Sequence, residues 1–196
     1  MRTATTSREK LYDTAARLFF QYGYRAVGVD TIAAESGVGK MTLYRHYPSK
    51  DDLIVAFLHQ SDADFWEYFE QCIAGASGAR EKLLAFFQGL QAYVLSPACY
   101  GCPFINVASE YPEATFAGHQ VALEHKEAVR TRFNSLAREA GARRPEALAN
   151  ALLLLMDGAY MAARMYGAGP DNPASGVAEA ARQLIDAHCS GYPAKG

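Results

Sequence analysis

The sequence has no long hydrophobic run, and this absence excludes a membrane-spanning helix. No uninterrupted apolar stretch is longer than Ala151 to Met156, whereas a helix that crosses a bilayer needs roughly 20 apolar residues. The first six residues are polar and lack the apolar segment of a secretory signal, so no export is expected. These two features together predict a cytoplasmic protein with no membrane partner.

Cysteine is scarce, with four residues in a chain of 196. Without an export signal, we expect these to be reduced thiols and not disulfides. Cys99 and Cys102 form a C-x2-C pair, but zinc would need two further ligands, and no second pair with metal-ligand spacing follows. We therefore expect no metal. A thiol-sensing role for Cys99 and Cys102 remains open, because it requires only accessible thiols with a lowered pKa.

Catalytic signatures are also missing. The sequence contains no G-x-S-x-G, no phosphate-binding loop and no H-E-x-x-H, which are the motifs that position a nucleophile, a nucleotide or a zinc ion. His119 and His125 are six residues apart, which places them on different faces of a helix. A helical redox enzyme built on the cysteine or the histidine pair is therefore the weaker alternative, and the sequence predicts neither an enzyme nor a cofactor.

Net charge is close to zero at −2, but it is distributed unevenly. Residues 1–50 carry eight bases and four acids, a balance of +4, whereas the remainder carries 11 bases and 17 acids, a balance of −6. Such an asymmetry indicates that one end of the chain meets a polyanion and the other does not. Residues 1–50 are the candidate contact surface.

The apolar residues that are present follow a helical period almost everywhere. In the first segment Leu11, Ala15, Leu18, Phe19 and Tyr22 fall on one stripe, with Ser7 as the expected N-cap and Gly23 as the stop. No segment has the alternation of a strand. We expect an all-α fold of about nine helices: one following Ser7, Val29–Ser36, Lys40 to about His46, Ser49 to about Ile73, one through Leu83 and Val94, Phe104–Glu110, about Ala114 to Ala140, Pro145–Tyr166, and Pro173–Cys189.

Two short predicted helices between residues 30 and 46 are joined by a turn through Gly37 and Val38, which is the geometry of a helix-turn-helix. Val38 and Leu43 are expected to face the core. The remaining side chains of the second helix suit a DNA groove, because they can donate to phosphate oxygens or meet base edges. The residues left toward solvent are Lys40, Met41, Thr42, Tyr44, Arg45 and His46.

The stretch from Val29 to Leu53, VDTIAAESGVGKMTLYRHYPSKDDL, strongly resembles the N-terminal DNA-binding signature of the TetR family of transcriptional repressors. With the preceding helix, the resemblance covers roughly residues 7–58. It implies a three-helix DNA-binding domain over residues 1–50 and an effector-binding and dimerisation domain over residues 51–196. The expected function is a repressor that a small-molecule effector releases from a palindromic double-stranded operator.

The resemblance also implies which residues contact DNA. The residues that fall where the family contacts DNA are Lys40, Met41, Thr42, Tyr44, His46 and Lys50. Thr31 falls on the first helix of the helix-turn-helix, near the DNA backbone. The chain departs from the family at Gly39, where serine is common, and so loses a side-chain N-cap. Glycine there costs only a few tenths of a kcal/mol relative to serine, so we expect no loss of function.

A homodimer is expected because two helix-turn-helix units must reach successive major grooves about 34–36 Å apart. The last two predicted helices, Pro145–Tyr166 and the segment to Cys189, carry small and apolar residues at spacings that permit close helix approach, and the family resemblance implies the same face.

The effector pocket is expected among aromatic and polar residues of the middle helices, since small-molecule sites are mostly apolar with a few orienting polar groups. Gly101 to Pro112 looks like a recurring motif of one TetR-like subgroup. The candidate lining residues are Phe65, Phe87, Tyr93, Phe104, Asn106, Tyr111, His125, Asp157, Tyr160 and Arg164, together with Phe116.

Overall fold

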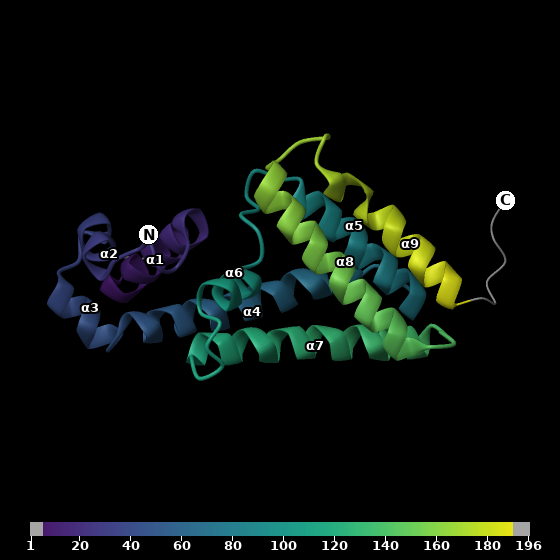
Figure 1. Ribbon diagram of the computed structural model, residues 1–196, viewed down its shortest axis with the longest axis horizontal. Coiled ribbons are helices and arrows are strands. Elements are labelled where there is room, and N and C mark those ends of the chain that lie inside the picture. The colour runs from purple at the N-terminus through teal and green to yellow at the C-terminus, as the bar shows by residue number, and fades with distance from the viewer. Residues whose placement is uncertain (1–5, 190–196) are drawn as a thin grey trace. The chain divides into compact units, whose positions relative to one another are not determined.

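The computed structural model describes residues 6–189, and within that range the chain folds entirely into helices and connecting turns (Figure 1). The all-α prediction is confirmed. In chain order the elements are α1 (Ser7–Tyr22), α2 (Val29–Ser36), α3 (Lys40–His46), α4 (Lys50–Ile73), α5 (Ala79–Val94), α6 (Pro103–Glu110), α7 (Ala117–Glu139), α8 (Pro145–Tyr166), the 3-10 turn η1 (Pro173–Gly176) and α9 (Val177–His188). Over residues 6–189, no helix is both long and apolar enough to cross a membrane.

The predicted N-cap at Ser7 is wrong by one residue. Thr6 caps α1: its hydroxyl accepts a hydrogen bond from the Glu9 amide at 3.2 Å, and the Glu9 carboxylate accepts one from the Thr6 amide at 2.7 Å. This capping box requires an acidic residue three positions after the cap, and Glu9 stands at that distance from Thr6, not from Ser7. Ser49, where the sequence places the start of another helix, caps α4, since its hydroxyl accepts a hydrogen bond from the Asp52 amide at 3.0 Å.

Two other helix starts differ from the prediction. Helix α7 begins at Ala117 and not near Ala114, because the chain first makes a turn in which the Phe116 amide donates to the Glu113 carbonyl at 2.9 Å. The last predicted helix is divided. Asn172 caps the 3-10 turn η1 by accepting from the Ala174 amide at 2.9 Å, and α9 proper starts at Val177.

The described chain forms two compact units. Unit 1 comprises residues up to Ala63 and Pro103–Leu123, and unit 2 comprises Asp64–Cys102 and the chain from Glu124 onward. These packing boundaries differ from the predicted division at residue 50 because the first half of α4 buries Leu53, Ile54, Phe57 and Leu58 within unit 1. The assignment of functional domains to residues 1–50 and 51–196 stays a prediction.

The core of unit 1 forms where α1 packs against α2 and α3. Phe19 of α1 lies 5.2 Å from the Tyr24 ring and 5.8 Å from the Phe57 ring of α4, measured between ring centroids. Ile32 of α2 and Leu43 of α3 are fully buried. These contacts fix the orientation of the short helices, which are too short to be stable alone.

The core of unit 2 is aromatic. Phe69, Phe86 and Phe133 are mutually in contact, with ring centroids 4.6–6.4 Å apart, and Phe87 stacks on Phe133 at 5.8 Å. Helices α5, α8 and α9 pack side by side (Figure 1). Phe87, one of the predicted effector contacts, is therefore a buried core residue of this cluster.

Candidate functional site

Helices α2 and α3 form the predicted helix-turn-helix. Helix α2 ends at Gly37, whose φ of 67° is left-handed and therefore favours glycine. The turn is closed by the Val38 amide, which donates to the Ala33 carbonyl at 3.2 Å and to the Ser36 hydroxyl at 3.2 Å. Buried Val38 and Leu43 then anchor α3, as the sequence predicts.

The outer face of α3 carries the residues that are expected to contact DNA. Met41 is 84% exposed, Tyr44 and Arg45 are also exposed, and Thr42 and His46 are half-buried. A long apolar side chain left this exposed on a helix has no packing role in the unit, whereas it can meet a thymine methyl group in a major groove. The exposures therefore fit the expected contact face, and the contacts themselves stay a prediction.

Two further candidates flank this face. Thr31 is exposed on α2, and Lys50 is half-buried as the first residue of α4. Burial lowers the pKa of Lys50, while the neighbouring carboxylates of Asp51 and Glu110 act in the opposite direction. The ammonium of Lys50 is therefore partly desolvated, which strengthens its interaction with an anion.

Acidic residues of α2 pair with bases on the helices that flank it. The Lys40 Nζ lies 2.7 Å from the Asp30 Oδ1, and the Arg17 guanidinium pairs with the Glu35 carboxylate. Sequence reasoning missed both pairs, because Asp30 and Lys40 are on different helices and their separation depends on the turn between them. The Asp30 carboxylate raises the pKa of Lys40, chiefly by accepting its hydrogen bond.

Helix α6 is attached to the turn between α1 and α2. The two carboxylate oxygens of Glu110 accept from the backbone amides of Tyr24 at 3.0 Å and Arg25 at 2.7 Å. The Tyr24 hydroxyl donates to the Pro103 carbonyl at 2.9 Å, so both ends of α6 contact the same turn. The Arg25 guanidinium also lies over the Tyr111 ring, 4.8 Å from its centroid.

The predicted effector contacts do not form a single group. Phe104, Asn106, Tyr111 and Phe116 belong to unit 1, and the other seven belong to unit 2. Within unit 1, Tyr111 stacks on Phe116 at 4.3 Å between centroids. Within unit 2 the contacts separate Phe65 and His125, whose rings meet edge to face at 4.8 Å, from Tyr93 and Tyr160, whose rings meet at 6.2 Å.

The two charged effector candidates have partners in unit 2. Asp157 pairs with Lys126 of α7, and both side chains are largely buried. Arg164 is exposed and donates to the Tyr100 carbonyl at 2.9 Å. Arg164 lies in the last turn of α8, and its role in effector binding stays a prediction.

The C-x2-C pair is buried. Cys99 and Cys102 are both buried, and burial raises the pKa of Cys99. The Lys126 ammonium donates to the Cys102 sulfur at 3.5 Å. The accessible, acidic thiols that sensing requires are thus not present at Cys99, while Cys102 has a cationic neighbour. Among residues 6–189, no cluster of three or more potential ligands could hold a metal ion.

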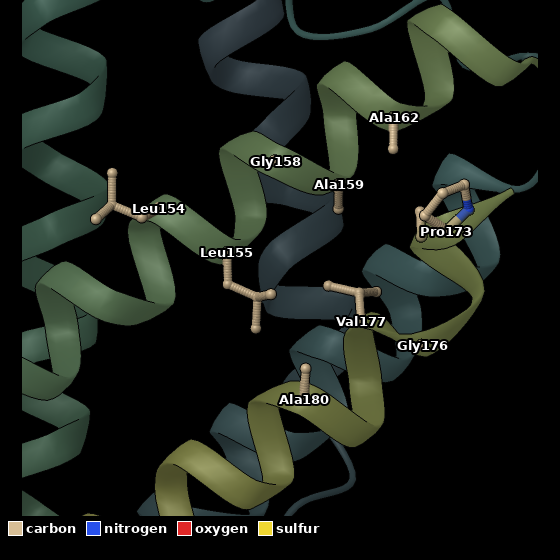
Figure 2. Close-up of a pocket in the computed structure, with 10 residues that line it drawn as sticks. Leu154, Leu155, Gly158, Ala159, Ala162, Pro173, Gly176, Val177 and Ala180 are labelled. Atoms are coloured by element: carbon tan, nitrogen blue, oxygen red, sulfur yellow. The ribbon is translucent and has the colours of Figure 1, made fainter.

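An apolar groove of about 320 Å³ runs between α8 and the segment formed by η1 and α9 (Figure 2). Small residues line much of it, including Gly158, Ala162 and Ala180. On α8, Leu154 is 72% exposed. Met161 and Met165, also exposed, follow it along one stripe of the helix at spacings of seven and four residues. The predicted dimer face is therefore apolar and uncovered in the isolated chain.

Comparisons with known proteins agree with this geometry. Residues 11–57 match the family model described as bacterial regulatory proteins of the tetR family. The chain is 32% identical over 85 residues to the HTH-type transcriptional regulator LmrA of Bacillus subtilis, which covers 43% of this chain and 45% of LmrA. It is 33% identical over 78 residues to the HTH-type transcriptional activator FasR of Mycolicibacterium smegmatis, which covers 40% of this chain and 36% of FasR. The matches thus span less than half the length of these relatives.

Solved structures extend the similarity to nearly the whole chain. A TetR-family transcriptional regulator from Streptomyces coelicolor superposes with a TM-score of 0.83 at 29% identity, covering 92% of this chain and 93% of that one. A putative regulator of the same type from Streptomyces avermitilis gives a TM-score of 0.81 at 28% identity, with 93% and 98% covered. These relatives are transcriptional regulators and not enzymes. Residues 11–57 are thus a TetR-type DNA-binding domain, and the described chain has the fold of TetR-family transcriptional regulators.

Proposed function

We propose that the protein is a transcriptional repressor that binds a palindromic DNA operator as a homodimer and is released by a small-molecule effector. The outward face of α3 is the observation that carries this proposal. Its apolar side anchors the helix through Leu43, and its other side presents Met41, Tyr44 and Arg45 to solvent. A helix of this length fits the major groove of B-DNA.

The side chains of this face can make two kinds of contact, to bases and to phosphates. Arg45 can make a bidentate contact with guanine, and Thr42 and Met41 can meet a thymine methyl group. Tyr44, His46 and Lys50 can donate to phosphate oxygens, which fixes the register but carries no sequence information. Thr31 adds a phosphate contact from α2.

A homodimer formed through the proposed face on α8 and α9 would supply the second helix-turn-helix. The groove between these helices (Figure 2) offers apolar surface that a second copy of the chain would cover. The exposed stripe through Leu154 and Met165 adds to this surface. Small residues at Gly158 and Ala162 allow two helices to approach closely. A symmetric interface of this kind places the same surface on both subunits.

Effector binding is proposed for unit 2, with Tyr93 and Tyr160 as orienting groups. A tyrosine hydroxyl is a protonated donor at neutral pH, and burial raises the pKa of Tyr93 to about 12 and that of Tyr160 as well. The chemistry favours an apolar molecule with a carbonyl or hydroxyl acceptor. The Tyr160→Phe variant keeps the ring and removes the donor, so it should weaken the binding of such a ligand in a thermal-shift screen.

Release would be a population shift, in which the effector binds the DNA-incompetent arrangement more tightly. Two connections could transmit it. Helix α4 begins beside the helix-turn-helix and continues into unit 2, and α6 holds the turn between α1 and α2 through Glu110. The segment leading into α6 comes directly from Cys102 of unit 2.

Fluorescence anisotropy on DNA from upstream of the protein's own and neighbouring genes tests the proposal. Excess random competitor and a salt series separate specific from nonspecific binding. We expect tight binding that resists competitor and is lost in Tyr44→Ala. The control is Tyr22→Ala, which removes an equally large exposed tyrosine from α1 and should bind like the wild type. Weak, sequence-independent binding of the wild type, also in a genome-wide DNA selection, would contradict the proposal.

The thiol-sensing alternative retains one favourable observation, the ammonium of Lys126 at the Cys102 sulfur. Because both thiols of the pair are buried, release by a small-molecule effector is the better-supported reading. Operator release that persists in the Cys99→Ser, Cys102→Ser protein would argue against sensing by these thiols.

A further inference from the structure

The Lys40–Asp30 pair links the first residue of α3 to the first turn of α2. The two atoms are 2.7 Å apart, with the Lys40 side chain 50% exposed and the Asp30 side chain 80% exposed. Such an exposed pair contributes little to stability. Its position at the proposed DNA face therefore calls for a role other than folding.

An acidic side chain at this point opposes DNA binding in general. The Asp30 carboxylate neutralises the charge that Lys40 would otherwise offer to a phosphate, and it is itself repelled by the DNA backbone. Non-specific affinity depends on the number of phosphates that basic residues neutralise. A lysine that is paired with a carboxylate of the same chain therefore contributes less to non-specific DNA affinity.

The same pairing leaves Lys40 able to read a base. An ammonium group has three N–H donors, and the carboxylate of Asp30 occupies one of them. The others remain available to the acceptors on the major-groove edge of a guanine. Because the side chain is held at one end of α3, its direction toward the groove is restricted, whereas a free lysine would follow the nearest phosphate.

We propose that Asp30 is a specificity-determining residue: it holds Lys40 as an oriented donor and suppresses binding to DNA of unrelated sequence. This inference rests on the proposed DNA-binding function. It assigns Asp30 a positioning role that acts through Lys40, without a contact of its own to a base.

The test measures binding to a random-sequence duplex, which needs no knowledge of the operator. We expect Asp30→Asn to bind random DNA about fivefold more tightly at low salt, with a salt dependence steeper by about 0.9 in slope, the value for one added phosphate contact. Asp30→Glu retains the carboxylate and should behave like the wild type. On an operator, Asp30→Asn should show no matching gain, so the ratio of specific to random affinity falls.

A double-mutant cycle tests whether Asp30 acts through Lys40. In a Lys40→Ala background, the gain from Asp30→Asn should shrink to the part that comes from direct repulsion between the Asp30 carboxylate and phosphate. Asp13→Asn, which removes another exposed carboxylate of unit 1, should give a smaller gain than Asp30→Asn in the presence of Lys40. The same gain with and without Lys40, or equal gains for Asp30→Asn and Asp13→Asn, would overturn the inference. A wild type that selects no operator would instead refute the proposed function, so the two failures are distinguishable.

Discussion

Glu110 accepts hydrogen bonds from two successive backbone amides, and the shorter of these joins it to Arg25 at 2.7 Å. This relationship connects the end of α6 to the turn that leads into the helix-turn-helix. The neighbouring Gly23 has a φ of 82°, and a side chain added there would come within 2.6 Å of the Glu110 Oε1. The turn and the carboxylate are therefore fitted closely to each other.

Replacing Glu110 with alanine should destabilise unit 1. The two amides would lose a charged acceptor, and bonds of this kind contribute about 1.5–3 kcal/mol. We expect a lower midpoint in urea unfolding followed by circular dichroism. Glu113→Ala is the matched control, because its contact with Arg25 is long at 3.9 Å and exposed, so it should unfold like the wild type. Equal midpoints for the two variants would show that the α6 contact does not stabilise the turn.

Residues on opposite sides of α3 should separate stability from DNA affinity. Leu43→Ala removes a fully buried side chain and should cost about 2–5 kcal/mol of unfolding free energy. Met41→Ala acts on a side chain that is almost fully exposed, so it should leave unfolding unchanged and reduce operator affinity. Paired measurements of unfolding and anisotropy check this. A loss of stability in Met41→Ala would mean that this face packs against protein.

A charge placed on the proposed dimer face should separate the subunits. Leu154→Arg introduces a guanidinium into the apolar stripe of α8, and burying it in a symmetric interface would place two like charges close together. Light scattering after size exclusion should show a monomer with weakened operator binding. Leu123→Arg alters another exposed leucine, on α7, and should remain a dimer. Dimers in both variants would place the interface elsewhere.

DNA binding should depend on pH through Lys50. Burial lowers the pKa of this lysine below the ordinary value, so its ammonium loses its proton at a lower pH than a free lysine as the pH rises. Since the neutral amine cannot attract a phosphate, affinity should decline as the pH approaches that lowered pKa and recover on return to neutral pH. Lys50→Arg keeps its charge throughout and should flatten the decline. An equally steep decline in the arginine variant would assign the effect to another group.

Thiol labelling should be slow in the native protein. Burial raises the pKa of Cys72, Cys99 and Cys189, and the reactive form of a thiol is its thiolate. We expect iodoacetamide at neutral pH to modify these residues far more slowly than in guanidinium, as measured by peptide mass spectrometry. Rapid native modification of Cys99 would revive the thiol-sensing alternative.

Much of the fold could be read from local sequence signals. The helix stops at Gly23 and Gly37 and the cap at Ser49 depend on residues within a few positions of one another, so periodicity and capping chemistry suffice to place them. The division of α3 into a buried Leu43 and an outward face follows from the same periodicity. The error at Thr6 arose because two adjacent residues can both cap, and only the position of Glu9 decides between them.

Contacts between distant segments were decided by the tertiary structure alone. The predicted effector residues illustrate this: Phe87 belongs to the aromatic core, and Arg164 lies at the surface, although the sequence made both of them effector candidates. The attachment of Glu110 to Tyr24 joins residues 86 positions apart, and the Lys40–Asp30 pair requires a particular turn between two helices. The sequence by itself determined which segments are helices and which family they resemble, because those signals are local. Which polar groups meet was set by packing, because a hydrogen bond or an ion pair between helices depends on the position of the whole backbone.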